Sequence, residues 1–462
     1  MKQLLQQVDT GATVIRDVPA PLCGAGEVLI ANAASLVSAG TEKMIVDLSK
    51  KSLLGKARER PDHVKRVLEK LRTEGVRETI SQVRAKLADP MTLGYSSAGV
   101  VLEVGRDVEA FRPGDRVASN GAHAEIVAVP QHLVGRVPES VAFEDACYAV
   151  VGAIALQGVR LAQLGLGDRV AVIGLGLIGQ LTTMLLRAAG CRVVGTDLDP
   201  AKRLLAEELG AETATADALL PLVLERTAGN GVDAVLITAS TSSNEPLELA
   251  ARLARKRARI VAVGAVGLNV PRREFYPKEL ELVVSCSYGP GRYDARYEER
   301  GEDYPYAFVR WTEQRNIDAV LEQIACGNLD VRRLTTHTFD VAAAQNAYEL
   351  IDSSEPYLGI VLTYPPIVDG PIVRSVPLSD ASSVRAGDGE IGVGFLGAGN
   401  FASLVLLPAL GSIPGVQKRA ICSAGGVSAA VRGARNGFEI ATTSAQSVVE
   451  DPNVAAVFVA TR

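Results

Sequence analysis

Short apolar runs alternate with helix-length segments in the middle of the chain. Residues 170–173 form an unbroken apolar run, which is typical of a strand buried on both faces of a parallel sheet. Residues 180–189 follow with the pattern of an apolar helix, and Gly190 ends it. A second strand is expected at residues 193–195. This strand–helix–strand order predicts an α/β fold with a doubly wound parallel sheet.

A glycine motif lies where the first of these strands turns into the helix. Gly174, Gly176 and Gly179 are spaced as G-x-G-x-x-G, with Leu177 and Ile178 inside the motif. Gly174 permits a tight turn, Gly176 lets the backbone approach a pyrophosphate, and Gly179 lets helix and strand pack closely. The N–H groups at the start of the helix then face the phosphates. This turn therefore predicts dinucleotide binding.

An acidic residue completes the pattern. Asp197 follows the second strand, 23 residues after Gly174, where its carboxylate can accept both hydroxyl groups of an adenosine ribose. A carboxylate at that place repels a 2′-phosphate, so NAD is favoured over NADP. Further strands are expected at residues 233–238 and 259–263, and Gly264, directly after the second, is included among the cofactor-binding residues.

The N-terminal part of the chain has a different pattern. Residues 1–47 are punctuated by Pro and Gly and predict β structure, whereas residues 50–89 place apolar side chains at helical spacing. The helical segment holds 12 Lys and Arg against 6 Asp and Glu, a local charge of +6. One interpretation is a solvated helical hairpin that covers a β edge. The other is a cationic lid or docking surface for an anionic substrate.

Aromatic side chains gather in residues 287–311. This stretch contains five of the 11 tyrosines and the only tryptophan, Trp311. Loops of this length inside a domain are usually functional or disordered, and the aromatic content argues against disorder. We interpret the stretch as part of a pocket wall. The alternative is a contact between domains or subunits.

A second glycine turn follows a linker rich in Pro, Ser and Gly. A strand from residue 391 leads into Gly397, Gly399 and Ala402, so the two glycines are further candidates for nucleotide contact. Ser423 stands where the first copy of the pattern has its acid, so the ribose contact is missing. The chain stops soon after a further strand, and we expect a truncated domain or one completed by partner chains.

Composition narrows the function classes. The chain is 47% hydrophobic and 22% charged with a net charge of −5, which offers no argument for nucleic-acid binding. Its N-terminus lacks the apolar core of a signal peptide, and no apolar run reaches the roughly 20 residues of a membrane span, so membrane insertion is not expected. The six cysteines form no C-x-x-C pair and only four histidines occur. This predicts reduced thiols, a cytoplasmic location and no Cys- or His-rich metal site, and it leaves a homo-oligomer open.

Four short motifs occur in order before the glycine turn: Ser38-Ala-Gly-Thr-Glu42, Leu93-Gly-Tyr-Ser-Ser-Ala-Gly99, Pro113-Gly-Asp-Arg-Val117 and Gly121-Ala-His-Ala-Glu125. With that turn, they make the first 365 residues resemble the medium-chain, zinc-type alcohol dehydrogenases. The resemblance implies a GroES-like β domain, split around a Rossmann domain, with NAD(P) in the cleft between them.

These patterns together predict the division of the chain. We expect a GroES-like catalytic domain first and an NAD-binding Rossmann domain second, followed by a return to the catalytic domain. A linker and an incomplete second Rossmann-like domain come last. The expected limits are 1–150 for the catalytic domain with its basic insert at 48–89, 151–285 for the Rossmann domain, 286–365 for the return, 366–389 for the linker and 390–462 for the last domain.

The chain departs from that family at the zinc ligands. Where the family has a cysteine ligand in Cys-Gly-(Ser/Thr)-Asp, this chain has Ala39. Where the family has a histidine ligand in Gly-His-Glu, this chain has Tyr95, and the four-cysteine loop for a structural zinc is missing. Catalytic zinc needs three protein ligands, and alanine and tyrosine cannot supply two of them, so we predict no zinc.

Two hydroxyl groups are the candidate catalytic residues. Thr41 matches the family's proton-relay hydroxyl and Tyr95 replaces its zinc-binding histidine, so both are expected to face the cleft. Without a metal, a hydrogen-bond donor must polarise the substrate oxygen, and this role is assigned to Tyr95 with Thr41 assisting. The alternative is that Tyr95 only fills the vacated metal site. Glu42 is expected to pair structurally, and His123 to pack at a strand end.

The motif Phe395-Leu-Gly-Ala-Gly-Asn400 and the closing run Val457-Phe-Val-Ala-Thr461 make residues 390–462 resemble the opening of the Gfo/Idh/MocA oxidoreductases. That family acts mostly on sugars and cyclitols, and the fused order is similar to bi-domain oxidoreductases associated with bacterial polysaccharide gene clusters. The resemblance implies an NAD-dependent dehydrogenase or reductase acting on a sugar or nucleotide-sugar. A metal-free quinone or enone reductase and a non-catalytic NAD-binding scaffold are the alternatives.

Overall fold

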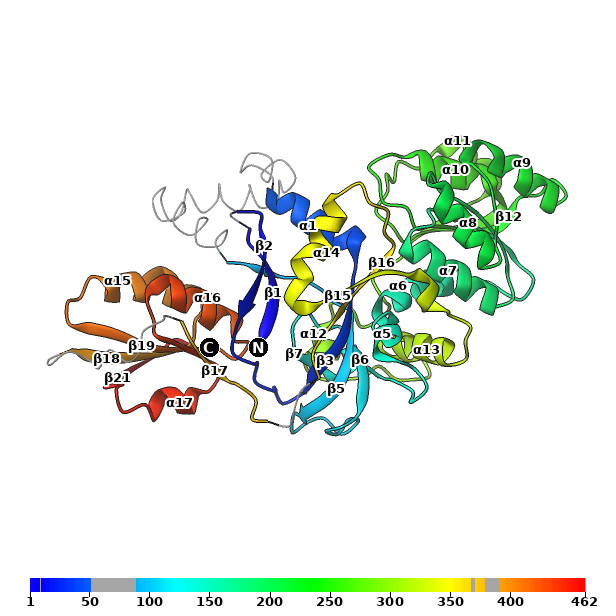
Figure 1. Cartoon of the computed structure of the whole chain (residues 1–462). Coiled ribbons are helices and arrows are strands. Elements are labelled where there is room, and N and C mark those ends of the chain that lie inside the picture. The colour runs from blue at the N-terminus through cyan, green and yellow to red at the C-terminus, as the bar shows by residue number, and fades with distance from the viewer. Residues whose placement is uncertain (9, 51–88, 367–369, 379–389, 462) are drawn as a thin grey trace.

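The computed structural model describes residues 1–8, 10–50, 89–366, 370–378 and 390–461. These residues form three blocks in a row: a central block that holds the N-terminus, a nucleotide-fold block on one side and a C-terminal block on the other (Figure 1). The two outer blocks each have a wholly or mainly parallel sheet with flanking helices, so the predicted α/β class is confirmed. The basic insert expected at 48–89 lies almost wholly outside the described residues, and its helical prediction stays untested.

The central block is built around one long strand, β3 (Glu27–Val37), which pairs with β5, β7 and β16. The seven-stranded sheet has the order β15-β16-β3-β5-β6-β8 with β7 paired to β3, and a three-stranded sheet has the order β2-β1-β4. Strands β15 and β16 return to this sheet after the nucleotide fold. The other elements of this block are β1 (Lys2–Gln6), β2 (Thr13–Asp17), α1 (Ala39–Lys50), β4 (Met91–Thr92), β5 (Ser97–Val104), β6 (Arg116–Ser119), β7 (Ile126–Pro130), η1 (Gln131–Leu133), β8 (Val134–Arg136), β15 (Thr335–Asp340), η3 (Val341–Ala343), α14 (Ala344–Asp352) and β16 (Gly359–Thr363).

The prediction of β structure up to residue 47 is wrong after Ser38, because helix α1 begins at Ala39. Ser38 starts this helix: its carbonyl accepts the N–H groups of Thr41 and Glu42, at 3.0 and 2.9 Å. The Glu42 carboxylate in turn accepts the Ser38 N–H at 2.8 Å. Such reciprocal bonds satisfy backbone groups that a helix end leaves free, which favours a helix over a continued strand.

The nucleotide-fold block contains a six-stranded parallel sheet of order β11-β10-β9-β12-β13-β14. Successive residues of β9 (Arg169–Ile173) pack into different cores: Val170 and Val172 contact helices α7 and α8, whereas Ala171 and Ile173 face α9 and α10. Both faces are buried, which explains the unbroken apolar run. The other elements are α6 (Ala149–Leu161), α7 (Leu177–Ala188), β10 (Arg192–Thr196), α8 (Pro200–Glu208), β11 (Glu212–Thr213), α9 (Ala216–Arg226), β12 (Val232–Ile237), α10 (Glu245–Leu253), β13 (Ala254–Ala262), α11 (Arg272–Lys278), β14 (Glu281–Val284), α13 (Glu313–Ala325) and η2 (Val331–Leu334). Two short helices, α5 (Phe143–Ala146) and α12 (Ala295–Glu298), pack against the central block.

The C-terminal block has a five-stranded sheet of order β17-β20-β19-β18-β21. The expectation of a plain linker over 366–389 is wrong at residues 375–377, which form β17 (Ser375–Pro377) and pair antiparallel with β20. The reason is burial, since Val376 is only 8% exposed at the edge of this sheet. The other elements are β18 (Ile391–Leu396), the π-helix η4 (Ala402–Leu406), α15 (Leu407–Gly411), β19 (Val416–Cys422), α16 (Val427–Asn436), β20 (Ile440–Thr442), α17 (Ala445–Val449) and β21 (Ala456–Val459).

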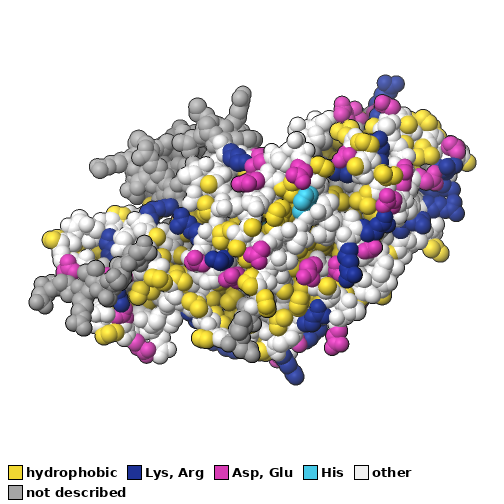
Figure 2. Space-filling view, in the orientation of Figure 1, with side chains coloured by type: hydrophobic (Ala, Val, Ile, Leu, Met, Phe, Trp, Pro, Cys, Tyr) yellow, Lys and Arg dark blue, Asp and Glu magenta, His cyan; other side chains and the backbone are white. Residues whose placement is uncertain are grey.

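Polar contacts join the C-terminal block to the central one. Arg374 donates to both carboxylate oxygens of Glu103, at 2.9 and 2.8 Å, and to the carbonyl of Pro21. The Leu22 N–H donates to the carbonyl of Ala424, at 2.9 Å. Side chains of both charges are interspersed over the face drawn in Figure 2. In the part of the chain that the structure describes, no helix combines the length and the apolar character needed to cross a bilayer.

Candidate functional site

The first glycine turn lies at the carboxyl end of β9 and requires glycine at two of its positions. Gly174 has φ +95°, and a Cβ there would lie 2.6 Å from the backbone nitrogen of Ala239. A Cβ on Gly179 would lie 2.0 Å from the carbonyl oxygen of Gly174. Gly176 differs, because a Cβ there would meet nothing within 4 Å. Gly174 and Gly179 therefore have no room for a side chain, whereas the space beside Gly176 is unoccupied.

The open side of this turn is the start of α7. Gly176 is its N-cap residue and has no side chain to occupy the helix end. Leu177 and Ile178 form the first turn of the helix, whose N–H groups lack partners within the helix. A helix end of this kind carries a partial positive charge and binds phosphate groups readily. The predicted residues Gly176, Leu177 and Ile178 thus share one surface.

Asp197 is half-buried directly after β10 and is bonded to the glycine turn. Its Oδ2 accepts the Leu175 N–H at 2.7 Å, and its Oδ1 accepts the Asp199 N–H at 2.9 Å. A carboxylate has about four acceptor positions, so both oxygens retain capacity for hydroxyl groups. The bond from Leu175 holds the carboxylate next to the turn.

Gly264 follows β13 and lies beside the same turn. A Cβ on Gly264 would lie 2.0 Å from the carbonyl oxygen of Ala239, the residue whose nitrogen lies closest to Gly174. Gly174, Ala239 and Gly264 therefore come together where β9, β12 and β13 end. This carboxyl edge is where ligands bind in open α/β sheets.

The second glycine turn resembles the first in its backbone but has no acidic residue at the position of Asp197. Gly397 has φ +107°, and a Cβ there would lie 2.6 Å from the carbonyl oxygen of Ala460, whereas Gly399 is open. Ser423 uses its hydroxyl to accept the Ala429 N–H of α16, at 3.1 Å.

An arginine lies at this second turn. Arg432 donates to the carbonyl of Ala398 at 2.5 Å and to the side-chain oxygen of Asn400 at 2.9 Å. It also forms an ion pair with Asp89, at 2.5 Å. The first turn thus presents a carboxylate and the second an arginine.

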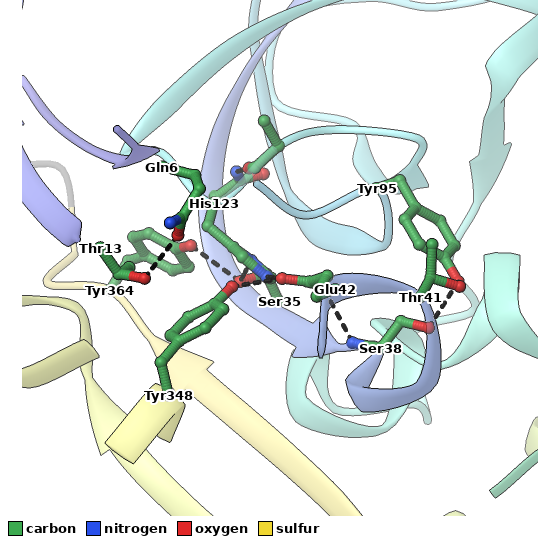
Figure 3. A network of polar contacts seen from close by, with 12 residues as sticks. Gln6, Thr13, Ser35, Ser38, Thr41, Glu42, Tyr95, His123, Tyr348 and Tyr364 are labelled. Carbon is green, nitrogen blue, oxygen red and sulfur yellow. Dashed lines mark hydrogen bonds and ion pairs between the residues drawn. The ribbon is translucent and has the colours of Figure 1, made fainter. Parts of the chain in front are cut away.

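Thr41 and Tyr95 lie next to each other (Figure 3). The Tyr95 hydroxyl donates to Ser38 Oγ at 2.6 Å, and Thr41 Oγ1 lies 3.5 Å from the Tyr95 oxygen. Burial raises the pKa of the Tyr95 phenol, although hydrogen bonds with Ser38 and Thr41 oppose the rise. Tyr95 is therefore a neutral hydroxyl at physiological pH and can donate a proton or a hydrogen bond.

A buried contact between a histidine and a glutamate lies behind these hydroxyl groups. His123 Nε2 is 3.3 Å from Glu42 Oε2, and both side chains are fully buried, with exposed fractions of 0% and 1%. His123 Nδ1 lies 2.7 Å from Ser35 Oγ, which lies 2.7 Å from the Tyr364 hydroxyl. The Tyr348 hydroxyl donates to Glu42 Oε2. Figure 3 shows Glu42 between this cluster and Ser38.

Opposing effects set the charge of Glu42. Burial by itself raises the pKa of this carboxyl, but the charge and hydrogen bond of His123 outweigh it, together with hydrogen bonds from Tyr348 and Ser38. The pKa of Glu42 is therefore held below its ordinary value of 4.5. The sequence indicated that Glu42 pairs structurally but not with which residue, because His123 lies 81 positions away.

The described residues contain no group of three or more His, Cys, Asp or Glu side chains arranged to hold a metal ion. Ala39 begins α1 and offers only a methyl group, and Tyr95 offers a phenol already bonded to Ser38. A pocket of about 930 Å³ lies elsewhere, along α11, lined by Arg257, Tyr276 and neighbouring residues and by none of the predicted site residues.

Two parts of the chain match known family models. Residues 178–300 match the model for "Zinc-binding dehydrogenase", and residues 70–139 match the "Alcohol dehydrogenase GroES-like domain". Among curated relatives, (R,R)-butanediol dehydrogenase of Bacillus subtilis is 32% identical over 31% of this chain and 50% of its own length. L-arabinitol 4-dehydrogenase of Talaromyces emersonii is 33% identical over 31% of this chain and 45% of its own. The chain thus spans about half the length of these two relatives.

The fold agrees with solved structures of the same kind. Alcohol dehydrogenase TADH from Thermus sp. ATN1 superposes with a TM-score of 0.60 at 20% identity, covering 79% of this chain and all of that one. At this identity the likeness concerns the fold alone. The resemblance of the first part of the chain is therefore confirmed for two domains: residues 70–139 match a GroES-like domain and residues 178–300 match a zinc-binding dehydrogenase domain of the medium-chain, zinc-type alcohol dehydrogenases.

Proposed function

We propose that the protein is a zinc-independent, NAD-dependent oxidoreductase that transfers hydride to or from an alcohol or carbonyl group of a sugar or nucleotide-sugar. One observation carries the proposal. The chain combines two features: an open glycine turn with a carboxylate beside it, and a neutral tyrosine at the position where the related enzymes have a zinc ligand. The relatives that act on butanediol and L-arabinitol support an alcohol or polyol substrate.

The residues of the first turn fit a dinucleotide. The pyrophosphate would pass over Gly176 and meet the N–H groups of Leu177 and Ile178, since nothing fills the space that a side chain would take. The free acceptor positions of Asp197 would hold the adenosine ribose. A bound nicotinamide dinucleotide supplies or takes up the hydride.

Replacing Asp197 with asparagine is expected to weaken NAD binding by roughly tenfold to a hundredfold and to narrow its preference over NADP. A hydrogen bond to a charged group contributes about 1.5–3 kcal/mol, and the repulsion of a 2′-phosphate disappears with the charge. Titration calorimetry with both cofactors measures the effect. Asp199→Asn is the matched control, because Asp199 caps α8 and asparagine caps helices equally well. Unchanged NAD affinity in Asp197→Asn would remove Asp197 from the ribose site.

The chain's own hydroxyl groups would replace the metal. The donor set at Ala39 and Tyr95 does not fit zinc, so we derive no step through it. Tyr95 keeps its proton because burial disfavours the phenolate, and it can turn its O–H from Ser38 to a substrate oxygen. Thr41 is exposed beside it and would help to position that oxygen.

Replacing Tyr95 with phenylalanine is expected to lower kcat by roughly a hundredfold while NAD affinity stays unchanged, because general acid–base groups contribute about 10²–10⁴ in rate. Steady-state kinetics on the substrate found by screening measures it. Tyr276→Phe is the control, since this tyrosine is exposed on α11. Unchanged turnover in Tyr95→Phe would mean that Tyr95 only fills the place of a metal ligand.

Metal analysis with a substrate screen tests the function as a whole. The purified protein should contain less than stoichiometric zinc and should reduce NAD with a sugar, polyol or nucleotide-sugar. Stoichiometric zinc would overturn the metal-free mechanism. Turnover of quinones or enones alone would favour the reductase alternative, and cofactor binding without any turnover would favour a scaffold.

We further propose that the C-terminal block is the opening of a Gfo/Idh/MocA-like nucleotide-binding domain. Its support is the glycine backbone at Gly397 and Gly399, with Ser423 in place of an acid. We also propose the domain limits given above, a cytoplasmic location and a homo-oligomeric assembly. The proposed linker no longer includes residues 375–377, because they form β17.

A further inference from the structure

Guanidinium groups and aromatic rings alternate beside the start of α13. The Arg160 guanidinium carbon lies 3.3 Å from the centre of the Trp311 ring, and that of Arg310 lies 3.8 Å from the same centre. Two groups so close to one ring centre can only occupy its opposite faces. Arg310 also lies 4.8 Å from the Tyr306 ring, and Arg315 lies 5.0 Å from it. We call Arg160, Trp311 and Arg310 the arginine sandwich.

The sandwich carries two positive charges that no carboxylate offsets within the part of the chain that is described. The neighbouring Arg315 is paired with Asp303. Arg160 has only a neutral partner, because its Nε donates to the side-chain oxygen of Asn316 at 2.8 Å. Burial first and the nearby charge of Arg310 second lower the pKa of Arg160 to about 10, so it remains charged at physiological pH. An anion at the rim of the indole ring, in contact with both guanidinium groups, would relieve their repulsion.

Its geometry suits a group with several oxygens. Guanidinium is planar and donates two parallel hydrogen bonds, which match the oxygens of phosphate or carboxylate. The Asn316 bond and the indole ring hold Arg160 in one orientation, so little side-chain freedom is lost on binding. Arg310 is exposed, which leaves the sandwich open to solvent on that side.

The sandwich adjoins the edge where the cofactor is expected. Helices α6 and α13 lie side by side, and Arg160 belongs to α6 (Figure 1). Asn316, which accepts the hydrogen bond of Arg160, also donates to the carbonyl of Tyr288 at 2.9 Å, four residues after the carboxyl end of β14. The segment that leads to Trp311 leaves the carboxyl end of β14, where Ser285 donates to the carbonyl of Ala262 at 2.9 Å.

We propose that Arg160 and Arg310, on the two faces of Trp311, bind a phosphate or carboxylate group of the small-molecule substrate. This assigns an anionic sugar derivative to the oxidoreductase, and in that respect it rests on the proposed function. The binding itself needs no turnover.

Trp311 is the chain's only tryptophan, so its fluorescence reports this site alone. Pyrophosphate, a sugar 1-phosphate and gluconate are titrated into the full chain at constant ionic strength, with sorbitol as the uncharged comparison. We expect a saturable change with a phosphate or the carboxylate and none with sorbitol. The anion that saturates at the lowest concentration identifies the group.

Arg160→Gln and Arg310→Gln should each weaken this binding at least tenfold, and Arg310→Lys, which keeps the charge, should retain more of it. Arg272→Gln is the matched control, because Arg272 also stacks on an aromatic ring, 4.8 Å from the centre of Tyr276, but on α11. Circular dichroism verifies that each variant is folded.

The wild-type titrations and the variants decide the inference. Absence of saturation with all three anions, an equal response to sorbitol, or unchanged affinity in both glutamine variants would each overturn it. NAD-dependent turnover is measured separately on the same protein. Turnover without anion binding removes only the sandwich, whereas anion binding without turnover on any substrate removes the proposed reaction.

Discussion

Replacing Gly179 with alanine is expected to lower the free energy of unfolding by about 3 kcal/mol and NAD affinity by roughly a hundredfold. The new Cβ would lie 2.0 Å from the Gly174 carbonyl oxygen and 3.1 Å from the Thr238 hydroxyl. A backbone oxygen cannot turn away as a flexible side chain does, so helix α7 must shift from β9. That shift strains the fold and moves the helix N-terminus from the phosphate position. Urea denaturation and cofactor titration measure the two effects.

Gly176→Ala separates folding from binding at the same turn. Its Cβ meets nothing within 4 Å, and its φ of −66° suits alanine. We expect the unfolding free energy to stay within about 0.5 kcal/mol of wild type, while NAD affinity falls because the methyl group takes the place of the pyrophosphate. Full NAD affinity in Gly176→Ala would show that the pyrophosphate does not cross this turn. Wild-type stability in Gly179→Ala would contradict the close packing.

Replacing His123 with alanine is expected to lower the unfolding free energy by about 3–5 kcal/mol. Removing one member of a buried ion pair leaves the other charge uncompensated in a medium that solvates it poorly. Here the remaining charge is Glu42, whose carboxylate is buried and also holds the start of α1 through the Ser38 N–H. Denaturant titration at neutral pH measures the loss.

The same pair makes stability depend on pH. The pKa of Glu42 is lower in the folded state than its ordinary value of 4.5, so its contribution is complete above pH 4.5 and is lost as pH falls through the folded pKa. In His123→Ala the burial of Glu42 dominates and raises its pKa, so this variant should instead gain stability on mild acidification, and Glu42→Gln should partly rescue it.

His337→Ala is the matched control for this prediction. His337 also lies near a glutamate, 3.5 Å from Glu355, but its side chain is 25% exposed and that of Glu355 is 63% exposed. Exposed pairs contribute about 0–1 kcal/mol, so little change is expected. Equal losses of unfolding free energy in His123→Ala and His337→Ala would mean that burial does not increase the contribution of the His123–Glu42 contact to stability.

The spacing of residues along the chain was enough to predict the nucleotide fold. The Gly174 turn, the helix after it and Asp197 lie within one strand–helix–strand unit, and their contacts follow from that unit's geometry. Helix α1 was missed because its start depends on the bonds that join Ser38 and Glu42, which periodicity does not report.

For the candidate catalytic pair, the sequence and the structure contributed different parts. Thr41 and Tyr95 were brought together by resemblance to a family, since 54 positions separate them, and the structure places their oxygens 3.5 Å apart. Their roles stay predictions. The buried partners behind them had no sequence signal, because Tyr348 on α14 and Tyr364 after β16 are distant in sequence and contact Glu42 and Ser35 only in the folded state.

The sequence by itself determined the α/β class, the two glycine turns and the single acid at Asp197, because these depend on contacts between neighbours along the chain. Only the tertiary structure decided that His123 contacts Glu42, that Arg432 lies at the second turn and that Arg160 contacts Trp311. Those contacts join residues from separate elements. Their energies depend on burial and on distances across the fold, and neither is encoded in local periodicity.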